Sequence, residues 1–276
     1  LALPQVLSNA TEGFSQGENI NLQDLRYVLE KHGLKVEYVQ TVDPYLLQPI
    51  EPNQNGQNIS LLAAAVRCGE TRLIDHTFLM NRKPIVAIDG PAGAGKSTVT
   101  SGFAERLGLL YLDTGAMYRA VAWFIKHEGI DLSDLEGIEK AMKGLKLELM
   151  QSTKAPQKVI INEHNVSDAI RSPEVTSIVS KIAALTPVRD ALTTQQKAMG
   201  INGGLVAEGR DIGTTVFPNA ELKIFLTASP AERARRRAID LENRGFDIPD
   251  LVELEAKIKE RDLLDMSRNI SPLLQS

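Results

Sequence analysis

The sequence predicts an α/β fold in which a parallel sheet carries a small antiparallel insertion and is preceded by a small, partial α+β domain. Three observations support this prediction. After residue 83, short apolar segments alternate with amphipathic segments, which is typical of parallel strands joined by crossover helices. A glycine-rich segment follows the first of these strands and precedes a helix. Between Leu145 and Ile170, apolar residues recur at every second position, which indicates short antiparallel strands.

The first 82 residues form the predicted α+β domain. A helix is expected over Leu22–Lys31, because its apolar residues share one face and Asn21 can cap it. Alternation between Val36 and Val42 predicts a strand, and the polar segment Glu51–Asn58 predicts a turn before the apolar run Ile59–Val66. These elements together indicate a small unit of mixed structure.

A domain boundary is expected at the polar segment Met80–Pro84, since the residue before a proline disfavours helix. We therefore assign residues 1–82 to the first domain and residues 83–276 to the second. The strands expected in the second domain are Ile85–Ile88, Leu110–Leu112, Leu205–Ala207 and Leu222–Leu226. The expected helices are Lys96–Leu107, Ala116–His127, Pro173–Leu185, Val188–Met199, Ala231–Asn243 and Leu251–Met266.

Composition and charge exclude several classes of protein. With 31 basic and 35 acidic residues the net charge is -4, which argues against a general binder of nucleic acid or of anionic membranes. No apolar run approaches the roughly 20 residues of a bilayer span, and no secretory signal opens the chain, so a cytoplasmic location is expected. The single cysteine excludes an internal disulfide, and the four histidines lack metal-ligand spacing. Because the chain begins at Leu1 rather than Met, we expect a fragment or a processed product.

The glycine-rich segment GPAGAGKST fits the phosphate-loop pattern of Gly, four residues, then Gly-Lys-Ser, and lies between a strand and a helix. In such a loop the backbone N–H groups and the start of the following helix face phosphate oxygens. Lys96 would reach the outer phosphates and Ser97 would bind Mg²⁺. The predicted nucleotide-binding residues are Gly90, Pro91, Ala92, Gly93, Ala94, Gly95, Lys96, Ser97 and Thr98.

Arginines are distributed over several segments of the second domain, including Arg119, Arg189, Arg210 and a group that begins at Arg233. A phosphoryl-transfer site needs cations from several segments, because donor and acceptor phosphates carry several negative charges. No Asn-Lys-x-Asp motif for guanine is present. The pattern therefore favours a small-molecule kinase over a GTP-dependent switch.

Five ordered segments of the second domain resemble the bacterial cytidylate kinases. They are IDGPAGAGKST, YLDTGAMYRA, AIRSPEVTSIVSKIA, VAEGRDIGTTVFP and KERDLLDMSRNISPL. The resemblance implies a nucleoside monophosphate kinase of the P-loop class, with an acceptor-binding insertion at about residues 140–185 and a mobile lid at about residues 230–248. It also implies ATP and Mg²⁺ as cofactors and CMP and dCMP as acceptors, with a monomeric kinase domain and neither nucleic acid nor membrane as partner. Members of the family continue past Gln275, so the C-terminal end is expected to be missing.

The same resemblance implies roles for particular residues. Thr114 and Arg119 match the segment that approaches the acceptor nucleotide. Ser180, Arg189 and Asp211 match cytosine-reading positions, and a carboxylate with a serine can satisfy the polar groups of cytosine that uracil does not present. Asp265 matches the contact to the ribose 2′-hydroxyl, and Arg261 shares its helix face. Arg210 and Arg268 match contacts to the acceptor phosphate. Arg233 and Arg237 match the lid arginines that close over ATP. Lys96, Arg119, Arg210, Arg233, Arg237 and Arg268 are the residues expected to stabilise the transferring phosphoryl group.

The first domain resembles the end of pantothenate synthetase, through VEYVQTVDPYLLQPI and SLLAAAVRCGETRLIDHTFL. The resemblance implies that a pantothenate synthetase domain is fused upstream and that the full-length protein also condenses pantoate with β-alanine. This chain contains no His-x-Gly-His, so we expect it not to activate pantoate by itself.

Two other functions remain open from the residues. A different P-loop kinase, acting on a metabolite alcohol, would need a base near the acceptor and would give Asp265 no role. A nucleotide-dependent binding module, with the first domain as its effector, would hydrolyse nucleotide slowly without an acceptor. Sequence also leaves open the preference among CMP, dCMP and UMP.

Overall fold

The computed structural model describes residues 2–50, 58–150, 156–268 and 270–275. The chain divides into two compact units, Leu1–Lys83 and Pro84–Ser276, and the expected boundary after residue 82 lies one residue earlier. The α/β class and the parallel sheet predicted for the second unit are confirmed. The turn predicted over Glu51–Asn58 lies, apart from Asn58, outside the described residues.

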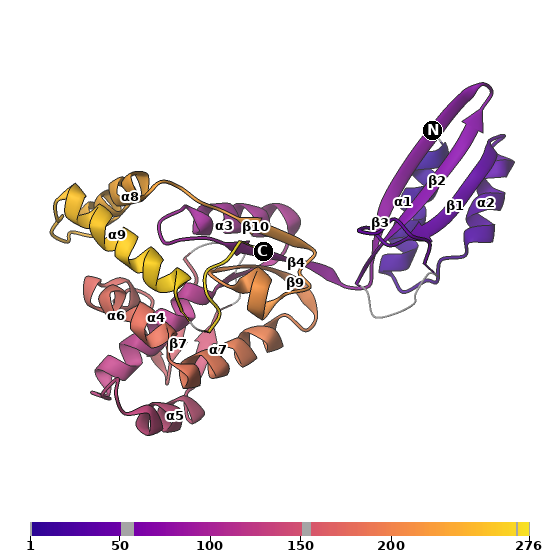
Figure 1. The fold of residues 1–276 in the computed structure, drawn as a ribbon. Helices are drawn as coiled ribbons and strands as arrows, with labels where there is room; N and C mark the ends of the chain where they lie inside the picture. The colour runs from indigo at the N-terminus through magenta and orange to yellow at the C-terminus, as the bar shows by residue number, and fades with distance from the viewer. Residues whose placement is uncertain (1, 51–57, 151–155, 269, 276) are drawn as a thin grey trace. The chain divides into compact units, whose positions relative to one another are not determined.

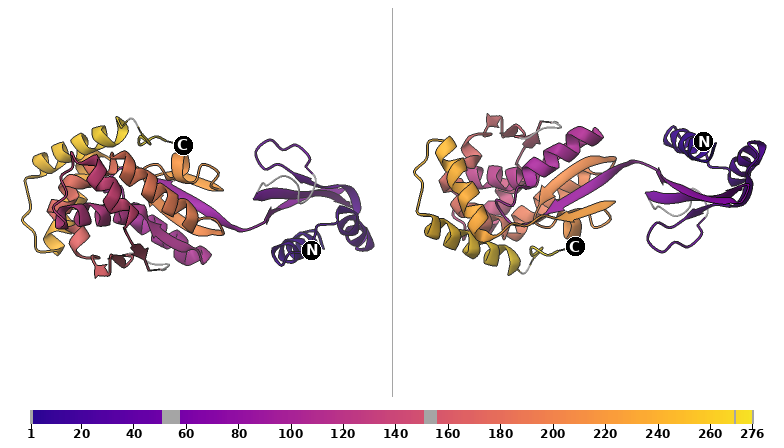
Figure 2. Two further views of the ribbon diagram at one scale, coloured as in Figure 1. Left: turned by 90° about the horizontal axis from the view of Figure 1, so that it is seen from below. Right: turned by 90° about the horizontal axis from the view of Figure 1, so that it is seen from above.

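The N-terminal unit is a three-stranded antiparallel sheet with two helices on one face (Figures 1 and 2). Its strands β1 (Lys35–Val42), β2 (Ile59–Cys68) and β3 (Thr71–Met80) pair in that order. Alternate residues of β2, namely Leu62, Ala64 and Val66, are fully buried against the helices, because successive side chains of a strand point to opposite faces. The apolar run Ile59–Val66 expected from the sequence therefore supplies core residues of this unit.

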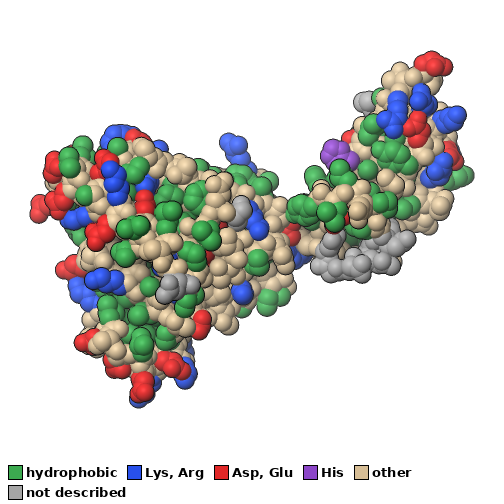
Figure 3. All heavy atoms as spheres, in the orientation of Figure 1, with side chains coloured by type: hydrophobic (Ala, Val, Ile, Leu, Met, Phe, Trp, Pro, Cys, Tyr) green, Lys and Arg blue, Asp and Glu red, His purple; other side chains and the backbone are tan. Residues whose placement is uncertain are grey.

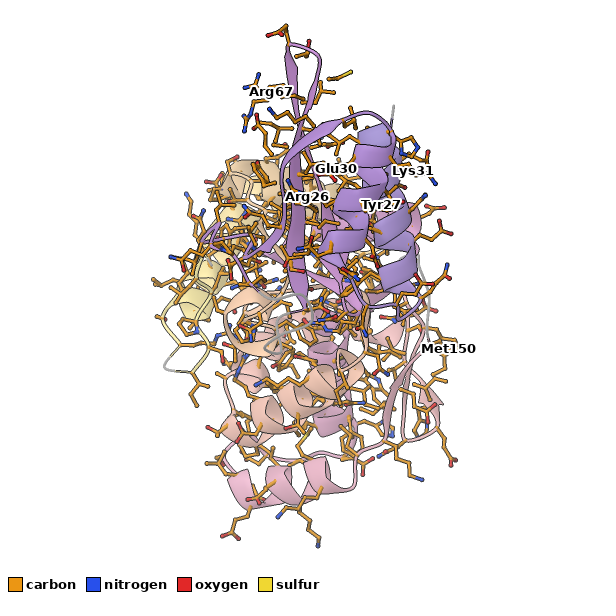
Figure 4. The ribbon with its side chains drawn as sticks, turned by 90° about the vertical axis from the view of Figure 1, so that its right-hand side faces the viewer. Arg26, Tyr27, Glu30, Lys31, Arg67 and Met150 are labelled. Atoms are coloured by element: carbon orange, nitrogen blue, oxygen red, sulfur yellow. The ribbon has the colours of Figure 1, made fainter. Side chains whose placement is uncertain are left out.

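The two helices of this unit are α1 (Ala2–Ser15) and α2 (Leu22–Lys31). The expected bounds of α2 are confirmed, and the Asn21 side chain accepts hydrogen bonds from the backbone of Gln23 and Asp24. Arg26, Tyr27, Glu30 and Lys31 project from the outer side of α2 (Figure 4). α1 and β3 were not predicted from the sequence, although Leu3, Val6 and Leu7 recur at helical spacing in α1.

The C-terminal unit is built on a four-stranded sheet in the order β10-β4-β9-β5 (Figure 1). The strands are β4 (Lys83–Asp89), β5 (Leu110–Asp113), β9 (Gly203–Gly209) and β10 (Leu222–Phe225), each within two residues of its predicted bounds at either end. β10 pairs with β4, and β5 with β9, in parallel. The carboxyl ends of these strands therefore meet at one edge of the sheet, where parallel α/β folds bind ligands.

Helices cover both faces of this sheet. On one face, Val86 and Ile88 of β4 pack with Ala104 of α3 (Lys96–Leu107). On the other, Ile85 and Ala87 join the large core that includes α4 (Thr114–His127) and α7 (Thr186–Met199). The predicted bounds of α3 are confirmed, but α4 begins two residues earlier than expected because the Asp113 side chain caps it.

The antiparallel insertion predicted between Leu145 and Ile170 is confirmed as a sheet of β6 (Leu147–Leu149), β7 (Val159–Ile161) and β8 (His164–Asn165). A short 3₁₀ helix, η1 (Ala169–Arg171), leads into α6 (Pro173–Ala183), which ends two residues before its predicted end. The helix α5 (Leu135–Lys143), which precedes the insertion, was not predicted, although Asp134 caps it and its buried residues Ile138 and Met142 lie one turn apart.

The last two helices, α8 (Pro230–Asn243) and α9 (Leu251–Met266), lie side by side and share a small core of Ala234, Leu241 and Leu254 (Figures 1 and 2). The predicted bounds of α9 are confirmed, and α8 begins one residue earlier than expected. Acidic and basic side chains are interspersed on the visible face of this unit rather than separated by sign (Figure 3). Within the described part of the chain, no helix has the length and apolar character of a membrane span.

Candidate functional site

The phosphate loop follows β4 at the carboxyl edge of the sheet. Gly90 has φ 146°, and a Cβ there would lie 1.9 Å from the carbonyl oxygen of Leu226, so only glycine fits this approach to the end of β10. Gly93 has φ 76°, and a Cβ added there would lie 3.3 Å from the Cβ of Arg233. α3 then begins at Lys96 without a side-chain cap, which leaves its first N–H groups available to an anion. The local sequence thus builds the anion-binding loop that its pattern predicts.

Lys96 lies inside this loop. Its ammonium group donates hydrogen bonds to the carbonyl oxygens of Gly90 (2.8 Å) and Pro91 (2.9 Å). Burial and the nearby Arg210 lower the pKa of Lys96 well below its usual value, and Glu208 and other carboxylates oppose that shift. Among the described residues, no carboxylate forms an ion pair with Lys96, so a nucleotide phosphate would supply the anion for this buried cation.

Carboxylates from three neighbouring strands converge beside the loop. Asp89 ends β4 and accepts hydrogen bonds from the backbone N–H groups of Ile212 (2.8 Å) and Gly213 (2.7 Å), which belong to the π-helical turn η2 (Ile212–Val216). Glu208 of β9 is hydrogen-bonded by the hydroxyl of Tyr111, and burial and Asp113 raise the pKa of Glu208. The negative charges of Asp89, Asp113 and Glu208, at the ends of β4, β5 and β9, each act to raise the pKa of Lys96.

Oxygen donors next to the loop fit Mg²⁺, which prefers carboxylate, hydroxyl and phosphate oxygens. The Ser97 hydroxyl lies close enough to the side chains of Glu208 and Tyr111 to lower the pKa of each, against the larger effect of burial. Among the described residues, no group of three or more histidine, cysteine or carboxylate side chains is arranged to hold a metal ion. A Mg²⁺ ion in this place would therefore depend on the phosphates of the nucleotide for part of its coordination.

The end of β5 holds the first predicted acceptor residues. The Asp113 carboxylate accepts a hydrogen bond from the N–H of Ala116 (2.8 Å) and pairs with Arg119 at 3.0 Å, so the cap of α4 also orients this arginine. The Thr114 hydroxyl donates to the carbonyl oxygen of Glu208 at 2.7 Å. Gln157, buried in the insertion, accepts from the N–H of Asp113 and donates to the carbonyl of Tyr111.

A buried ion pair joins Arg189 of α7 to Asp211, which follows β9. The two side chains are 2% and 6% exposed, and Arg189 also donates to the carbonyl oxygen of Ala183 at 3.1 Å. The Arg189 guanidinium lies 5.5 Å from the centre of the Tyr118 ring. The positive charge of Arg268 also acts on Tyr118. It lowers the pKa of the Tyr118 hydroxyl, whereas burial, the largest effect, raises that pKa. The predicted partners Arg189 and Asp211 are therefore in direct contact.

Three predicted residues meet on the other side of this cluster. Arg210 pairs with the buried carboxylate of Asp265 of α9 at 3.0 Å. Burial and repulsion by Arg210 lower the pKa of Arg261 to about 10. The charge of Arg210 also lowers the pKa of Lys96, so Arg210 lies between the phosphate loop and α9.

Four of these arginines leave a buried donor unsatisfied. The Nε–H groups of Arg119, Arg189, Arg261 and Arg268 have no hydrogen-bond partner in the described part of the chain. Native proteins pair nearly all buried polar groups, so a cluster of unpaired N–H donors indicates an absent acceptor. The cluster is also rich in positive charge, which makes an anion the acceptor that fits.

The arginines of α8 divide between the two parts of the site. Arg233 is buried and donates to the carbonyl oxygen of Ala92 (3.2 Å), and Arg236 donates to that of Ala94 (3.1 Å), so both contact the phosphate loop. Arg237 instead pairs with Asp240 at 2.8 Å, and burial, together with the charges of Arg244 and Arg119, lowers its pKa. The predicted pair Arg233 and Arg237 thus faces two different regions.

The structure leaves two predicted residues apart from these contacts. Ser180 is half-buried on α6, and no hydrogen bond joins it to Arg189 or Asp211 in the described part of the chain. Thr98 is exposed in the first turn of α3.

Several site residues were missed in the sequence analysis. These are Asp89, Tyr111, Asp113, Gln157, Glu208 and Asp262. A polar residue at the end of an expected strand was the available signal for Asp89 and Asp113. The sequence gives no comparable signal for Gln157, which reaches the site from the insertion.

Comparisons with known proteins identify two families along the chain. The sequence model of the family "Cytidylate kinase" matches residues 86–276, and that of "Pantoate-beta-alanine ligase" matches residues 1–78. A protein of Prochlorococcus marinus (strain MIT 9303) named "Bifunctional pantoate ligase/cytidylate kinase" is 63% identical over 276 residues, which are all of this chain and 56% of that protein. A protein of Synechococcus sp. (strain CC9311) with the same name is 59% identical over 273 residues, 99% of this chain and 55% of that protein.

The chain thus spans about half the length of the curated relatives it matches. Among solved structures, TT1252 from Thermus thermophilus matches 69% of this chain and 86% of its own at 16% identity, with a TM-score of 0.32, a likeness too distant to inform the fold or the site.

Proposed function

The chain belongs to the cytidylate kinase family through residues 86–276, and on that premise we propose that it transfers the γ-phosphoryl group of ATP to CMP or dCMP. The observation that carries the proposal is the cluster of unpaired, buried N–H donors on Arg119, Arg189, Arg261 and Arg268 beside the phosphate loop. A nucleoside monophosphate offers both a phosphate and a base edge to such a cluster. The phosphate loop on the other side would hold the triphosphate of ATP.

In the proposed reaction, an oxygen of the acceptor phosphate forms a bond to the γ-phosphorus of ATP. The bond between that phosphorus and the β–γ bridging oxygen breaks, and ADP leaves with the electron pair. The second pKa of a phosphate monoester is about 6, so the acceptor is already mostly dianionic at neutral pH. No side chain of this protein has to remove a proton.

The side chains then act by position and charge. Lys96 would follow the transferring group, and Arg119, Arg210 and Arg268 would neutralise the acceptor phosphate. Ser97, with Glu208 beside it, would hold Mg²⁺, which when bound supplies charge neutralisation at the β- and γ-phosphates. Arg233 and Arg237 are proposed to hold the lid in place over ATP.

Base recognition is proposed for Arg189 and Asp211, with Ser180 as an additional contact. The buried Arg189–Asp211 pair leaves a guanidinium N–H group free and offers a carboxylate, so it can present both a donor and acceptors to the edge of cytosine. Asp265 is proposed to bind the ribose 2′-hydroxyl. ATP and CMP are cytoplasmic metabolites, so we place the reaction in the cytoplasm.

An ADP-release assay with CMP, dCMP, UMP, AMP and GMP tests the proposal. We expect the highest kcat/KM with CMP or dCMP. Equal rates with all five acceptors would contradict the cytosine assignment, and ADP release that needs no acceptor would contradict kinase activity itself.

The relatives suggest that this chain is part of a longer protein. For that longer protein we propose a second activity, the ATP-dependent joining of pantoate to β-alanine. It rests on the match of residues 1–78 and on the names of the relatives. Expression of the full-length gene and an assay for pantoate-dependent release of AMP would test it, and a protein active only toward CMP would contradict it.

A further inference from the structure

An ion pair connects α9, the helix that carries acceptor residues, to the phosphate loop. Asp262 lies on α9 next to Arg261, and its carboxylate accepts hydrogen bonds from both terminal nitrogens of Arg233, at 2.9 Å from Nη1 and 2.5 Å from Nη2. The same Nη1 donates to the carbonyl oxygen of Ala92 in the phosphate loop at 3.2 Å, and Nε donates to that of Ala228 at 2.9 Å. The guanidinium group therefore bridges α9 and the loop.

The bridge is shielded from water. The Arg233 side chain is 3% exposed and that of Asp262 is 19% exposed. A two-point arginine–carboxylate contact fixes both distance and orientation, and charges that are shielded from solvent interact more strongly than exposed ones. Arg233 also packs directly over the loop at Gly93. A shift of α9 would therefore be transmitted to the loop through Arg233.

The other ion pairs of α8 do not have this geometry. Arg236 also contacts the loop, but its carboxylate partner is Glu232 of the same helix. Arg235 pairs with Glu232 at 2.9 Å and is 60% exposed. Among the described residues, Asp262 is the carboxylate that joins a loop-contacting arginine to α9.

We propose that Asp262 is a positioning residue that couples the binding of acceptor and donor. An acceptor held by Arg261 and Asp265 fixes α9, and the adjacent Asp262 then fixes Arg233 and the backbone of the phosphate loop at Ala92. The loop so fixed binds the donor phosphates more tightly. This inference rests on the proposed function, because it takes the residues of α9 as acceptor contacts.

Binding of a non-hydrolysable ATP analogue, measured by calorimetry with and without CMP, tests the coupling. In the wild-type protein we expect CMP to lower the Kd of the analogue about tenfold, within the range of about 5 to 150-fold seen for coupled sites, and the analogue to lower the Kd of CMP by the same factor. In Asp262→Asn, we expect CMP to change the Kd of the analogue by less than about twofold. The Kd of CMP alone should change less than about threefold.

Two further variants make the test specific. Arg233→Lys keeps the charge but lacks the fork that contacts Asp262 at two points, so it should lose the coupling as Asp262→Asn does, even if the latter folds poorly. Glu253→Gln removes an exposed ion pair with Lys257 on the same helix and should keep the wild-type factor.

The outcomes separate this inference from the proposed function. A folded Asp262→Asn or Arg233→Lys protein that keeps the tenfold factor would overturn the coupling role while leaving the kinase intact. A wild-type protein that binds both ligands without coupling would do the same. Failure of the wild type to bind CMP at all would instead overturn the proposed function.

Discussion

The phosphate loop and the arginine cluster are built in opposite ways, although they lie next to each other. The loop is one contiguous segment, residues 90–98, whose contacts are made largely by backbone groups and by the start of α3. The arginine cluster takes its side chains from α4, α7, α9 and the segment after β9. A backbone site is specified by a few glycines and one lysine, whereas a side-chain site depends on many positions that only the fold brings together.

This difference predicts two kinds of response to substitution. In the loop, the glycines, Lys96 and Ser97 are the residues whose identity matters most. The other side chains contribute little to ligand binding, because the ligand would contact backbone N–H groups. In the cluster, Arg119, Arg189 and Arg210 each pair with a carboxylate, so removing one side chain changes the partners of another. Acceptor selectivity should therefore change with substitutions in the cluster and overall turnover with substitutions in the loop.

The largest effect is expected for Lys96→Ala. The substitution removes the buried ammonium group that would follow the transferring phosphoryl group, and loss of one such electrostatic contact lowers turnover by roughly 10² to 10³-fold. Steady-state kinetics with ATP and CMP would measure it, with Lys257→Ala on the exposed side of α9 as a control. A Lys96→Ala protein within about threefold of wild type would contradict the role of Lys96.

Asp211→Ala should change selectivity more than overall turnover. We expect kcat/KM for CMP to fall about 10 to 100-fold and that for UMP to fall much less, because only cytosine leaves a polar partner unpaired. Since the substitution also leaves Arg189 buried without its carboxylate, the free energy of unfolding should drop by about 3–5 kcal/mol. Kinetics on both acceptors and a denaturant titration measure the two effects, and equal losses on CMP and UMP would mean that Asp211 only holds Arg189 in place.

A smaller and more selective effect is expected for Asp265→Ala. Activity with CMP should fall about tenfold, as expected for a lost hydrogen bond to a charged group, while activity with dCMP should stay within about threefold. Only the ribonucleotide has the 2′-hydroxyl. Because Asp265 also pairs with Arg210, a parallel loss on both acceptors would show that its role is to orient that arginine.

The smallest effect is expected for Glu232→Gln, a carboxylate of α8 that reaches the phosphate loop only through Arg236. Hydrogen bonds from Arg235 and Arg236 lower the pKa of Glu232 to about 2. A carboxyl whose pKa is lowered on folding stabilises the protein above its unfolded pKa of about 4.3, and this contribution is lost as the pH falls through about 2. The melting temperature of the variant should therefore differ from that of the wild type by the same small amount at every pH from 5 to 8, and kcat should remain unchanged. A difference that varied with pH in this range would contradict the assignment.

Much of the fold could be predicted from the sequence, because its signals are local. The phosphate loop between β4 and α3, the antiparallel insertion and the full extent of α9 follow from periodicity, glycine placement and helix capping. α1 and α5 were missed although both have apolar residues at helical spacing. β3 was missed because no more than one of its ten residues is buried. A strand with little buried surface gives a weak alternation signal.

By itself, the sequence determined the chemistry of the donor side, because nine consecutive residues fix the shape of the loop and the position of Lys96 within it. The tertiary structure alone decided which charged residues meet. It placed Asp211 against Arg189 and Asp265 against Arg210, and it brought Gln157 from the insertion to the backbone beside Asp113. It also separated Arg237 from Arg233 and gave Arg233 a partner on α9. The physical reason is that ion pairs between distant segments depend on distance and burial, and neither is encoded in the spacing of residues along the chain.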